Sequence, residues 1–390
     1  MRFSKLAGII LAAMALTSCQ PFQVNPGNTR VAVILPLSGP LGRVGEEMRN
    51  SIAMASMDRP SNVEIKYFDS LGTAEGAFAA GQGAQSFGAG LVLGPLVGAN
   101  ISEVRRGLNT GASIISFSND ATKASPNNFI FNLTPADSIN RVLEFSAANE
   151  NLSIGMLYPS NDLGRASAAA AAQIAPTLGI DLVAAFPYDV DAGRDGATSR
   201  QQAAQKMAEL SDLIDGLLLP DRGPRLREIA TLAFFYELEP PEENLEDSSD
   251  LDQELQVTES DEEPREKITY LGTHLMDDAS LANEPALSGA YFAGINDRLE
   301  QFEQRYSNNF SSSPQIHSVA AYDAMSMAIS LVSNGKGLGY QSLTNRSGFV
   351  GVLGTYRLLG NGQVERLLGI KTIGKDGIEL VDLPARSFEN

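Results

Sequence analysis

The chain has 390 residues, a formal net charge of −18, one cysteine and two histidines. Nucleic acids and anionic membrane faces are disfavoured as partners, because their negative charge would be repelled by that of the chain. One cysteine and two well-separated histidines are too few for a His-rich metal site, and the length allows two domains with substantial cores.

The first residues have the pattern of a lipoprotein signal peptide. An apolar-rich run over residues 6–16 follows two basic residues and ends shortly before Cys19, which makes it shorter than the roughly 20 residues that cross a bilayer. Leu-Thr-Ser-Cys resembles a bacterial lipobox, which implies that residues 1–18 are removed, that Cys19 is lipidated and that residues 19–30 form a tether. A residue other than Asp after the cysteine, here Gln20, implies the outer membrane by the sorting rule of such lipoproteins. An ordinary signal peptide with an incidental cysteine is the alternative.

Residues 31–57 predict a strand, a loop and a helix. Residues 31–35 are apolar without interruption, which is typical of a strand covered on both faces. Prolines and glycines over residues 36–42 then favour a tight loop. The apolar positions of residues 45–57 recur with helical spacing, and two glutamates, Glu46 and Glu47, are expected in the first helical turn.

This opening resembles that of a known family. Residues 35–50 read L-P-L-S-G-P-L-G-R-V-G-E-E-M-R-N, which is similar to the start of type I periplasmic binding domains and closest to the penicillin-binding protein activator (LpoA-like) lipoproteins. The segments L-T-P-A-D-S, from Leu133, and 354–370 carry the same resemblance. It implies an α/β fold with two lobes, each an open, mainly parallel sheet flanked by helices.

Strand-like and helix-like segments alternate through both halves of the chain, which predicts βαβ units and parallel sheets. The strands expected in the first half are 31–35, 63–68, 90–93, 112–117 and 128–133, and those in the second are 153–158, 181–186, 215–219, 268–271 and 290–295.

The resemblance also implies how the chain divides. The first lobe would comprise residues 31–138 plus 297–349, and the second lobe residues 139–296 plus 350–383. A glycine-rich turn at residues 360–362 predicts a hairpin with strands at 354–358 and 366–371, which the resemblance assigns to the second lobe. Residues 237–267 hold fourteen acidic and two basic residues, so we expect a disordered insertion in the second lobe.

The motifs of common catalytic sites are incomplete. Ser38 lies in P-L-S-G-P, which lacks the first glycine of a nucleophile elbow. Residues 335–337 lack the spacing of a P-loop, and residues 81–83 lack the third glycine of a dinucleotide-binding loop. We therefore expect a protein with no catalytic residues, no cofactor and no metal.

Open α/β sheets bind ligands in the loops that follow the carboxyl ends of their strands. The candidate cleft residues chosen on this ground are Ser38, Gly39, Leu41, Gly94, Leu96, Ser116, Ser118, Asn119, Tyr158, Asn161, His274 and Asn296. In amino-acid receptors of the resembled fold, Ser and Thr of such loops hold the ligand carboxylate. Here residues 94–98 carry no hydroxyl, whereas Ser116, Ser118 and Asn119 offer polar groups. The sequence is compatible with two interpretations: these residues bind a ligand, or they cap helices and line an empty cleft.

Two functions follow from the resemblance. The first is a non-catalytic envelope lipoprotein, lipid-anchored in the periplasm, that binds and regulates a bifunctional penicillin-binding protein. The second is a solute-binding lipoprotein that captures amino acids or similar small ligands for an ABC transporter. In both, the membrane is touched through the lipid anchor alone, and nucleic acid is not a partner.

Overall fold

A computed structural model describes residues 29–236, 238, 268–295, 298–385 and 387–388. The expected signal peptide, Cys19, all but the end of the tether, Asn296 and nearly all of the acidic insertion lie outside these residues. Among the described helices, none has the length and apolar character needed to cross a membrane.

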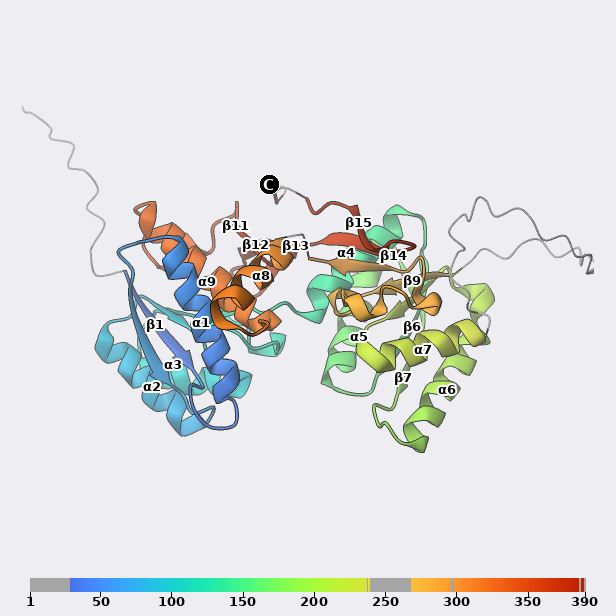
Figure 1. The fold of residues 1–390 in the computed structure, drawn as a ribbon, viewed down its shortest axis with the longest axis horizontal. Helices are drawn as coiled ribbons and strands as arrows, with labels where there is room; N and C mark the ends of the chain where they lie inside the picture. The colour runs from blue at the N-terminus through green and yellow to red at the C-terminus, as the bar shows by residue number, and fades with distance from the viewer. Residues whose placement is uncertain (1–28, 237, 239–267, 296–297, 386, 389–390) are drawn as a thin grey trace, which may run out of the picture.

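The first lobe is built around a parallel sheet with strand order β2-β1-β3-β4-β5 (Figure 1). Its strands are β1 (Arg30–Leu35), β2 (Glu64–Asp69), β3 (Leu91–Leu93), β4 (Ser113–Ser116) and β5 (Asn128–Ile130). Alternate residues of β1 face opposite layers, because successive side chains of a strand point to opposite sides. Val31 and Val33 pack toward α1 and α9, and Ala32 packs toward α2 and α3. The first-lobe helices are α1 (Gly42–Asp58), α2 (Ala74–Phe87), α3 (Ile101–Leu108), α8 (Arg298–Phe310), α9 (Ile316–Ser333) and α10 (Tyr340–Leu343).

The second lobe repeats this topology and extends it. Its seven strands follow the order β15-β14-β10-β9-β8-β6-β7, and the five from β10 to β7 are parallel. They are β6 (Ser153–Pro159), β7 (Asp181–Tyr188), β8 (Gly216–Leu219), β9 (Thr269–Gly272), β10 (Tyr291–Gly294), β14 (Gly369–Gly374) and β15 (Gly377–Asp382). The helices α4 (Pro135–Ala148) and α5 (Asp162–Ile174) cover one face, and α6 (Arg194–Ala208) and α7 (Gly223–Phe235) cover the other. In each lobe the first strand in sequence lies between the second and the third, so the loops after these strands flank a switch point where ligands bind in such sheets.

The predicted fold class is confirmed: two lobes, each with a mainly parallel sheet between helices, stand side by side in Figure 1. All ten expected strands of the two halves are present, although several end one to three residues from the expected bounds. One local expectation is wrong. Because α1 begins at Gly42, Glu46 and Glu47 lie beyond its first turn, and Glu47 is almost fully buried.

The predicted hairpin exists but belongs to the first lobe. β11 (Phe349–Gly351), β12 (Gly354–Leu358) and β13 (Val364–Leu367) form a separate antiparallel sheet. Tyr356 and Leu358 are buried in the first-lobe core, and the amide of Ile130 donates to the carbonyl of Gly362. The assignment of this hairpin to the second lobe is therefore wrong.

The expected strand over residues 366–371 is also split. Its first part ends β13, and Ile370 already lies in β14 of the second-lobe sheet, so the chain passes between lobes at Leu368. At this point the Arg141 Nε donates to the Leu368 carbonyl at 2.8 Å. Two other passages join the lobes, between β5 and α4 and between β10 and α8.

A buried carboxylate on α9 holds the hairpin in place. Asp323 is 1% exposed and accepts hydrogen bonds from the amides of Val352 and Leu353 at 2.7 and 2.9 Å. Burial raises the pKa of Asp323 to about 6, although these two amides and the charge of Arg366 oppose the rise. The hairpin therefore packs on the first lobe through a specific polar contact as well as apolar side chains.

The packing of the hairpin on the first lobe predicts that two alanine substitutions lower the stability of the protein by different amounts. Gly362 and Gly335 both have positive φ, so alanine strains each backbone by roughly 1–2 kcal/mol. A Cβ at Gly362 would lie 2.3 Å from the Ser125 carbonyl oxygen, whereas at Gly335 it meets no atom within 4 Å. Overpacking should make Gly362→Ala destabilising by at least ~2 kcal/mol more than Gly335→Ala in urea unfolding. Equal losses would contradict this placement of the hairpin.

Candidate functional site

The first-lobe candidates lie together at the carboxyl edge of their sheet, but their hydroxyls serve the fold. The buried Ser116 Oγ donates to the carbonyl of Pro95 at 2.8 Å, which ties the loop after β4 to the loop after β3. The buried Ser118 Oγ accepts from the Asp120 amide at 3.0 Å. Asn119 is exposed beside them. These two hydroxyls already have partners within the lobe.

The loop after β1 is closed in a similar way. Ser38 Oγ donates to Asp69 Oδ2 at 2.6 Å, and the amides of Leu37 and Leu71 donate to Asp69 Oδ1. Partial burial tends to raise the Asp69 pKa, but these hydrogen bonds outweigh it and hold the pKa below its usual value. Gly39 and Leu41 complete this loop, with Gly39 in the left-handed region at φ 75°. The carboxylate at the end of β2 therefore organises the loop that was expected to hold a ligand.

The other candidates have mainly structural contacts. Gly94 is required by close packing, since a Cβ there would lie 1.9 Å from the Ile34 carbonyl oxygen, and Leu96 packs on the first-lobe core. Asn161 caps α5 by accepting from the Gly164 amide at 3.0 Å. Tyr158 is half-buried against the second-lobe core. None of these residues lines either of the two cavities described below.

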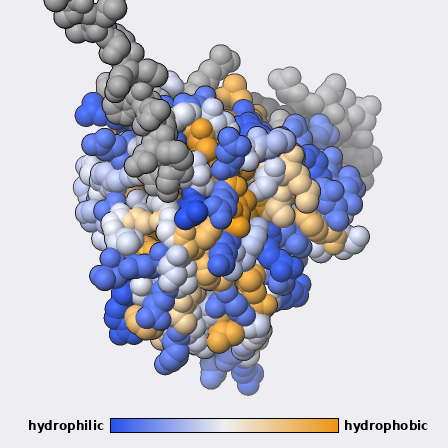
Figure 2. Space-filling view, turned by 90° about the vertical axis from the view of Figure 1, so that its left-hand side faces the viewer, coloured by the Kyte–Doolittle hydropathy of each residue, from blue (hydrophilic) through white to orange (hydrophobic). Residues whose placement is uncertain are grey.

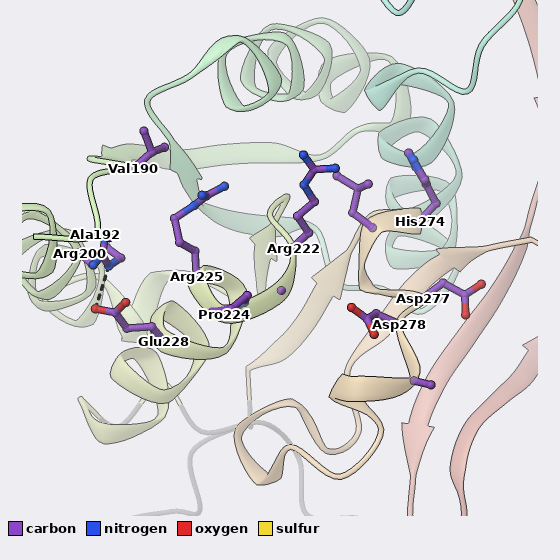
Figure 3. Close-up of a pocket in the computed structure, with 13 residues that line it drawn as sticks. Val190, Ala192, Arg200, Arg222, Pro224, Arg225, Glu228, His274, Asp277 and Asp278 are labelled. Atoms are coloured by element: carbon purple, nitrogen blue, oxygen red, sulfur yellow. Dashed lines mark ion pairs between the residues drawn. The ribbon is translucent and has the colours of Figure 1, made fainter. Parts of the chain in front are cut away.

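Among the candidates that the structure describes, His274 is the one that lines a cavity. A cavity of about 890 Å³ is formed in the second lobe by loops after β7, β8 and β9 (Figure 3). Val190 and Ala192 come from the first of these loops, Arg222 from the second, and His274 to Ala279 from the third. The start of α7 and the side chain of Arg200 from α6 complete it. A smaller cavity of about 380 Å³ lies between Lys371 of the second lobe and Glu303 of α8.

Three arginines line the larger cavity, and two of them are paired. Arg200 is 3% exposed and contacts Glu228 at 2.8 Å. Arg225 binds the fully buried carboxylate of Asp221 through Nε and Nη2, at 3.0 and 2.9 Å. Arg222 has no side-chain hydrogen bond or ion pair to any described residue, and its guanidinium lies between Arg225 and His274 in Figure 3.

His274 is held as a neutral side chain at physiological pH. Its Nδ1 shares a hydrogen bond of 2.6 Å with the hydroxyl of Ser138, a buried residue of α4, and its amide donates to the same oxygen. Burial, followed by the charges of Arg222 and Arg366, lowers the pKa of His274 to about 4. The imidazole therefore fixes the position of the loop after β9 and contributes no charge to the cavity.

The arginines of this cavity were missed at the level of sequence, although a signal was present. The loop P-D-R-G-P-R follows the apolar strand β8 with a proline and a glycine, the same pattern that marked the other strand ends. The described residues contain no cluster of three or more His, Cys, Asp or Glu arranged to hold a metal ion. Among the described residues that line it, the cavity offers hydrogen-bond donors and one guanidinium without a side-chain partner, which suits binding.

Comparison with known proteins identifies the architecture. The family model described as periplasmic binding protein matches residues 28–210. A search among curated proteins found no match to the sequence.

Solved structures extend the likeness to nearly the whole chain. One from Rhodospirillum rubrum, provisionally assigned to a branched-chain amino acid ABC transporter, superposes with a TM-score of 0.71 at 15% identity, over 90% of this chain and 99% of that one. The LpoA C-domain from Haemophilus influenzae, described as a regulator of PBP1A, gives 0.66 at 14% identity, over 90% and 99%. A solute-binding protein of an ABC transporter from Rhodopseudomonas palustris BisB5, in complex with 3,4-dihydroxy benzoic acid, gives 0.58 at 14% identity, over 92% and 97%. Identities this low establish the two-lobed fold and nothing further.

The environment of His274 predicts a pH-dependent contribution to stability. The unfolded chain binds a proton at this imidazole below a pH of about 6.5, whereas the folded chain binds it only near pH 4. Unfolding therefore takes up a proton at pH 5, which costs the folded state about 2 kcal/mol relative to pH 7.5. The stability advantage of the wild type over His274→Asn should shrink by that amount at pH 5 in urea unfolding. If the difference in unfolding free energy between wild type and variant is the same at both pH values, or if His274 of the folded protein titrates near pH 6.5 by NMR, the side chain is not held neutral.

Proposed function

Starting from the two-lobed periplasmic-binding-protein fold, we propose that this chain is a non-catalytic regulator that binds a bifunctional peptidoglycan synthase in the cell envelope. The observation that carries the proposal is the closure of the first-lobe loops. The hydroxyls of Ser38, Ser116 and Ser118 are engaged by neighbouring groups of the same lobe. Among these three candidates, the hydroxyls of Ser38 and Ser116 already donate within the lobe and that of Ser118 accepts an amide, which leaves few groups for an amino-acid carboxylate. A protein partner does not need them.

The sequence resemblance supports the same choice of partner. Residues 35–50 are similar to the penicillin-binding protein activators, and a domain described as a regulator of PBP1A shares the fold over 90% of this chain. A regulator of this kind would act by binding the active state of the synthase more tightly than its inactive state.

The outer face of the first lobe is compatible with a transient partner. Figure 2 shows hydrophobic residues in small groups between hydrophilic ones on the part of this face that the described residues form. Interfaces of non-obligate complexes are about as apolar as the rest of a protein surface, so a large apolar patch is not required.

Lipidation of Cys19 would keep the regulator at the outer membrane, facing the periplasm. Two or three acyl chains anchor a protein stably, because each buried CH₂ contributes about 0.8 kcal/mol. Cell fractionation tests this part of the proposal: Cys19→Ala should move the protein from the membrane fraction to the soluble fraction. Retention of the variant in the membrane fraction would argue against a lipid anchor.

The central test is an activity assay on the synthase. The purified chain should bind the periplasmic part of a bifunctional penicillin-binding protein from the same cell and raise its rate of glycan polymerisation or cross-linking. The rate should saturate with the concentration of the chain, since each synthase offers a limited number of sites. The chain alone should leave the lipid-linked precursor unchanged, which serves as the control for catalysis. If the chain neither binds the synthase nor changes its rate, the proposal that it is a regulator is refuted.

The second-lobe cavity favours a second function, the capture of a small solute for an ABC transporter. Its volume of about 890 Å³ lies within the range of small-molecule sites. A small ligand and a protein partner are compatible, because a ligand held in one lobe leaves the rest of the surface accessible.

A further inference from the structure

Among the described residues, the charged side chains that line the second-lobe cavity are engaged by other groups of the protein, with one exception. Glu228 is bound to Arg200, and Asp277 is bound to Lys371 at 2.8 Å. Asp278 accepts from the Ser280 amide at 2.8 Å, where it caps a short helical turn. The carboxylates that line the cavity are thus engaged by groups of the protein itself. A cationic ligand would have to displace one of these contacts.

Arg222 is the exception. No described residue accepts a hydrogen bond from its guanidinium or forms an ion pair with it, and its side chain is exposed at the cavity. Arg225, one turn further along, is held in place by two hydrogen bonds to the carboxylate of Asp221. The cavity therefore presents one guanidinium that is free to bind an anion.

The backbone beside Arg222 strengthens this preference. Arg222 is the N-cap of α7, a helix of 13 residues, and no side chain caps this end and no acidic residue occupies its first turn. By contrast, the N-terminus of α4 is closed by a capping box, in which Thr134 and Asp137 each accept a hydrogen bond from the backbone amide of the other. The amides in the first turn of a helix have no intrahelical partner, and they carry the positive end of its dipole. Both features of α7 favour a negative group at the same place as Arg222.

Arg366 of β13, whose charge also acts on His274, has only part of its guanidinium hydrogen-bonded to described residues. Arg366 is 6% exposed, and its Nε and Nη1 are buried without a hydrogen-bond acceptor among the described residues. Its Nη2 donates to the Phe131 carbonyl, and its guanidinium lies over the Phe131 and Tyr356 rings. The charges of Arg366 and Arg222 both act on the imidazole of His274, which lines the cavity. Because the charge of Arg366 also acts on the buried carboxylates of Asp137 and Asp323, Arg222 is the guanidinium that an anion beside His274 would meet.

We propose that the second-lobe cavity binds a small organic carboxylate, with Arg222 and the first turn of α7 as its receptors and His274 as a neutral wall. The proposal rests on the binding function inferred above, but it does not depend on which partner the chain regulates. The charged end of the ligand would lie on the second lobe, and the remaining volume of about 890 Å³ would accommodate its carbon skeleton. Carboxylate recognition would then occur on the opposite lobe from the hydroxyl-bearing loops expected from the sequence.

Calorimetric titration of the purified chain tests this inference. The probes are a panel of aliphatic, aromatic and dicarboxylic acids, led by benzoate and succinate, each paired with its neutral amide. At least one carboxylate should bind with one-to-one stoichiometry, and its amide should bind at least about tenfold more weakly, as expected when a charge-assisted hydrogen bond is lost.

Two variants locate the site. Arg222→Gln should weaken binding of that carboxylate at least about tenfold. Arg346→Gln is the matched control, because Arg346 is another exposed arginine, lies on the first lobe far from the cavity lining, and should leave affinity unchanged. Circular dichroism and the melting temperature should match the wild type for both variants, since neither residue has a side-chain hydrogen bond or ion pair within the described structure.

The inference is overturned if no carboxylate of the panel binds, if amides bind as well as acids, or if Arg222→Gln retains full affinity. Its failure is distinguishable from that of the proposed function. If no carboxylate binds but the chain stimulates the synthase fully, only the ligand-site proposal is refuted. If a carboxylate binds but the chain has no effect on the synthase, the regulator proposal is refuted and the solute-binding function is retained.

Discussion

The arrangement of the two lobes depends on the buried carboxylate of Asp323. A buried charge is costly unless hydrogen bonds satisfy it, and here the amides of Val352 and Leu353 do so. This contact fixes the start of the antiparallel sheet on the first lobe, and Gly351 must be glycine because a Cβ there would lie 2.5 Å from the carboxylate. The chain can then reach the second-lobe sheet only after β13. The passage at Leu368 places β14 antiparallel to β10 and extends the sheet of the second lobe.

The two lobes differ in whether the polar groups at their sheet edges are already hydrogen-bonded within the protein. In the first lobe, Asp69 and Ser116 close the loops at the sheet edge, so that the polar groups there stabilise the fold. In the second lobe, the loops after β7, β8 and β9 stand apart and enclose a charged cavity. Arg222, the one cation of its described lining without a side-chain partner, lies at the start of a helix that no side chain caps. Ligand binding is therefore expected in the second lobe.

Much of the fold followed from local sequence patterns. Uninterrupted apolar runs predicted the parallel strands, and the turn at Gly362 predicted a hairpin, because both signals act over a few residues. The lobe on which the hairpin packs depends on Asp323 and Tyr356, whose contacts are distant in sequence, and there the prediction failed. The candidate site shows the same limit. A position at a strand end was predictable for Ser116 and His274, but whether a side chain is free or already bonded depends on remote partners such as Pro95 and Ser138. Arg222 could be recognised only once the neighbouring charged side chains were seen to have partners within the protein.

Amide hydrogen exchange, measured on the chain with and without a saturating carboxylate, tests most directly whether ligand chemistry resides in the second lobe. Binding at the cavity should slow exchange in residues 222–228 and 273–279, two segments that contribute lining residues to it. Residues 37–42, 94–98 and 116–119 should exchange at the same rate in both states. Protection confined to these first-lobe loops would contradict the assignment, because it would place the ligand where the hydroxyls are already engaged.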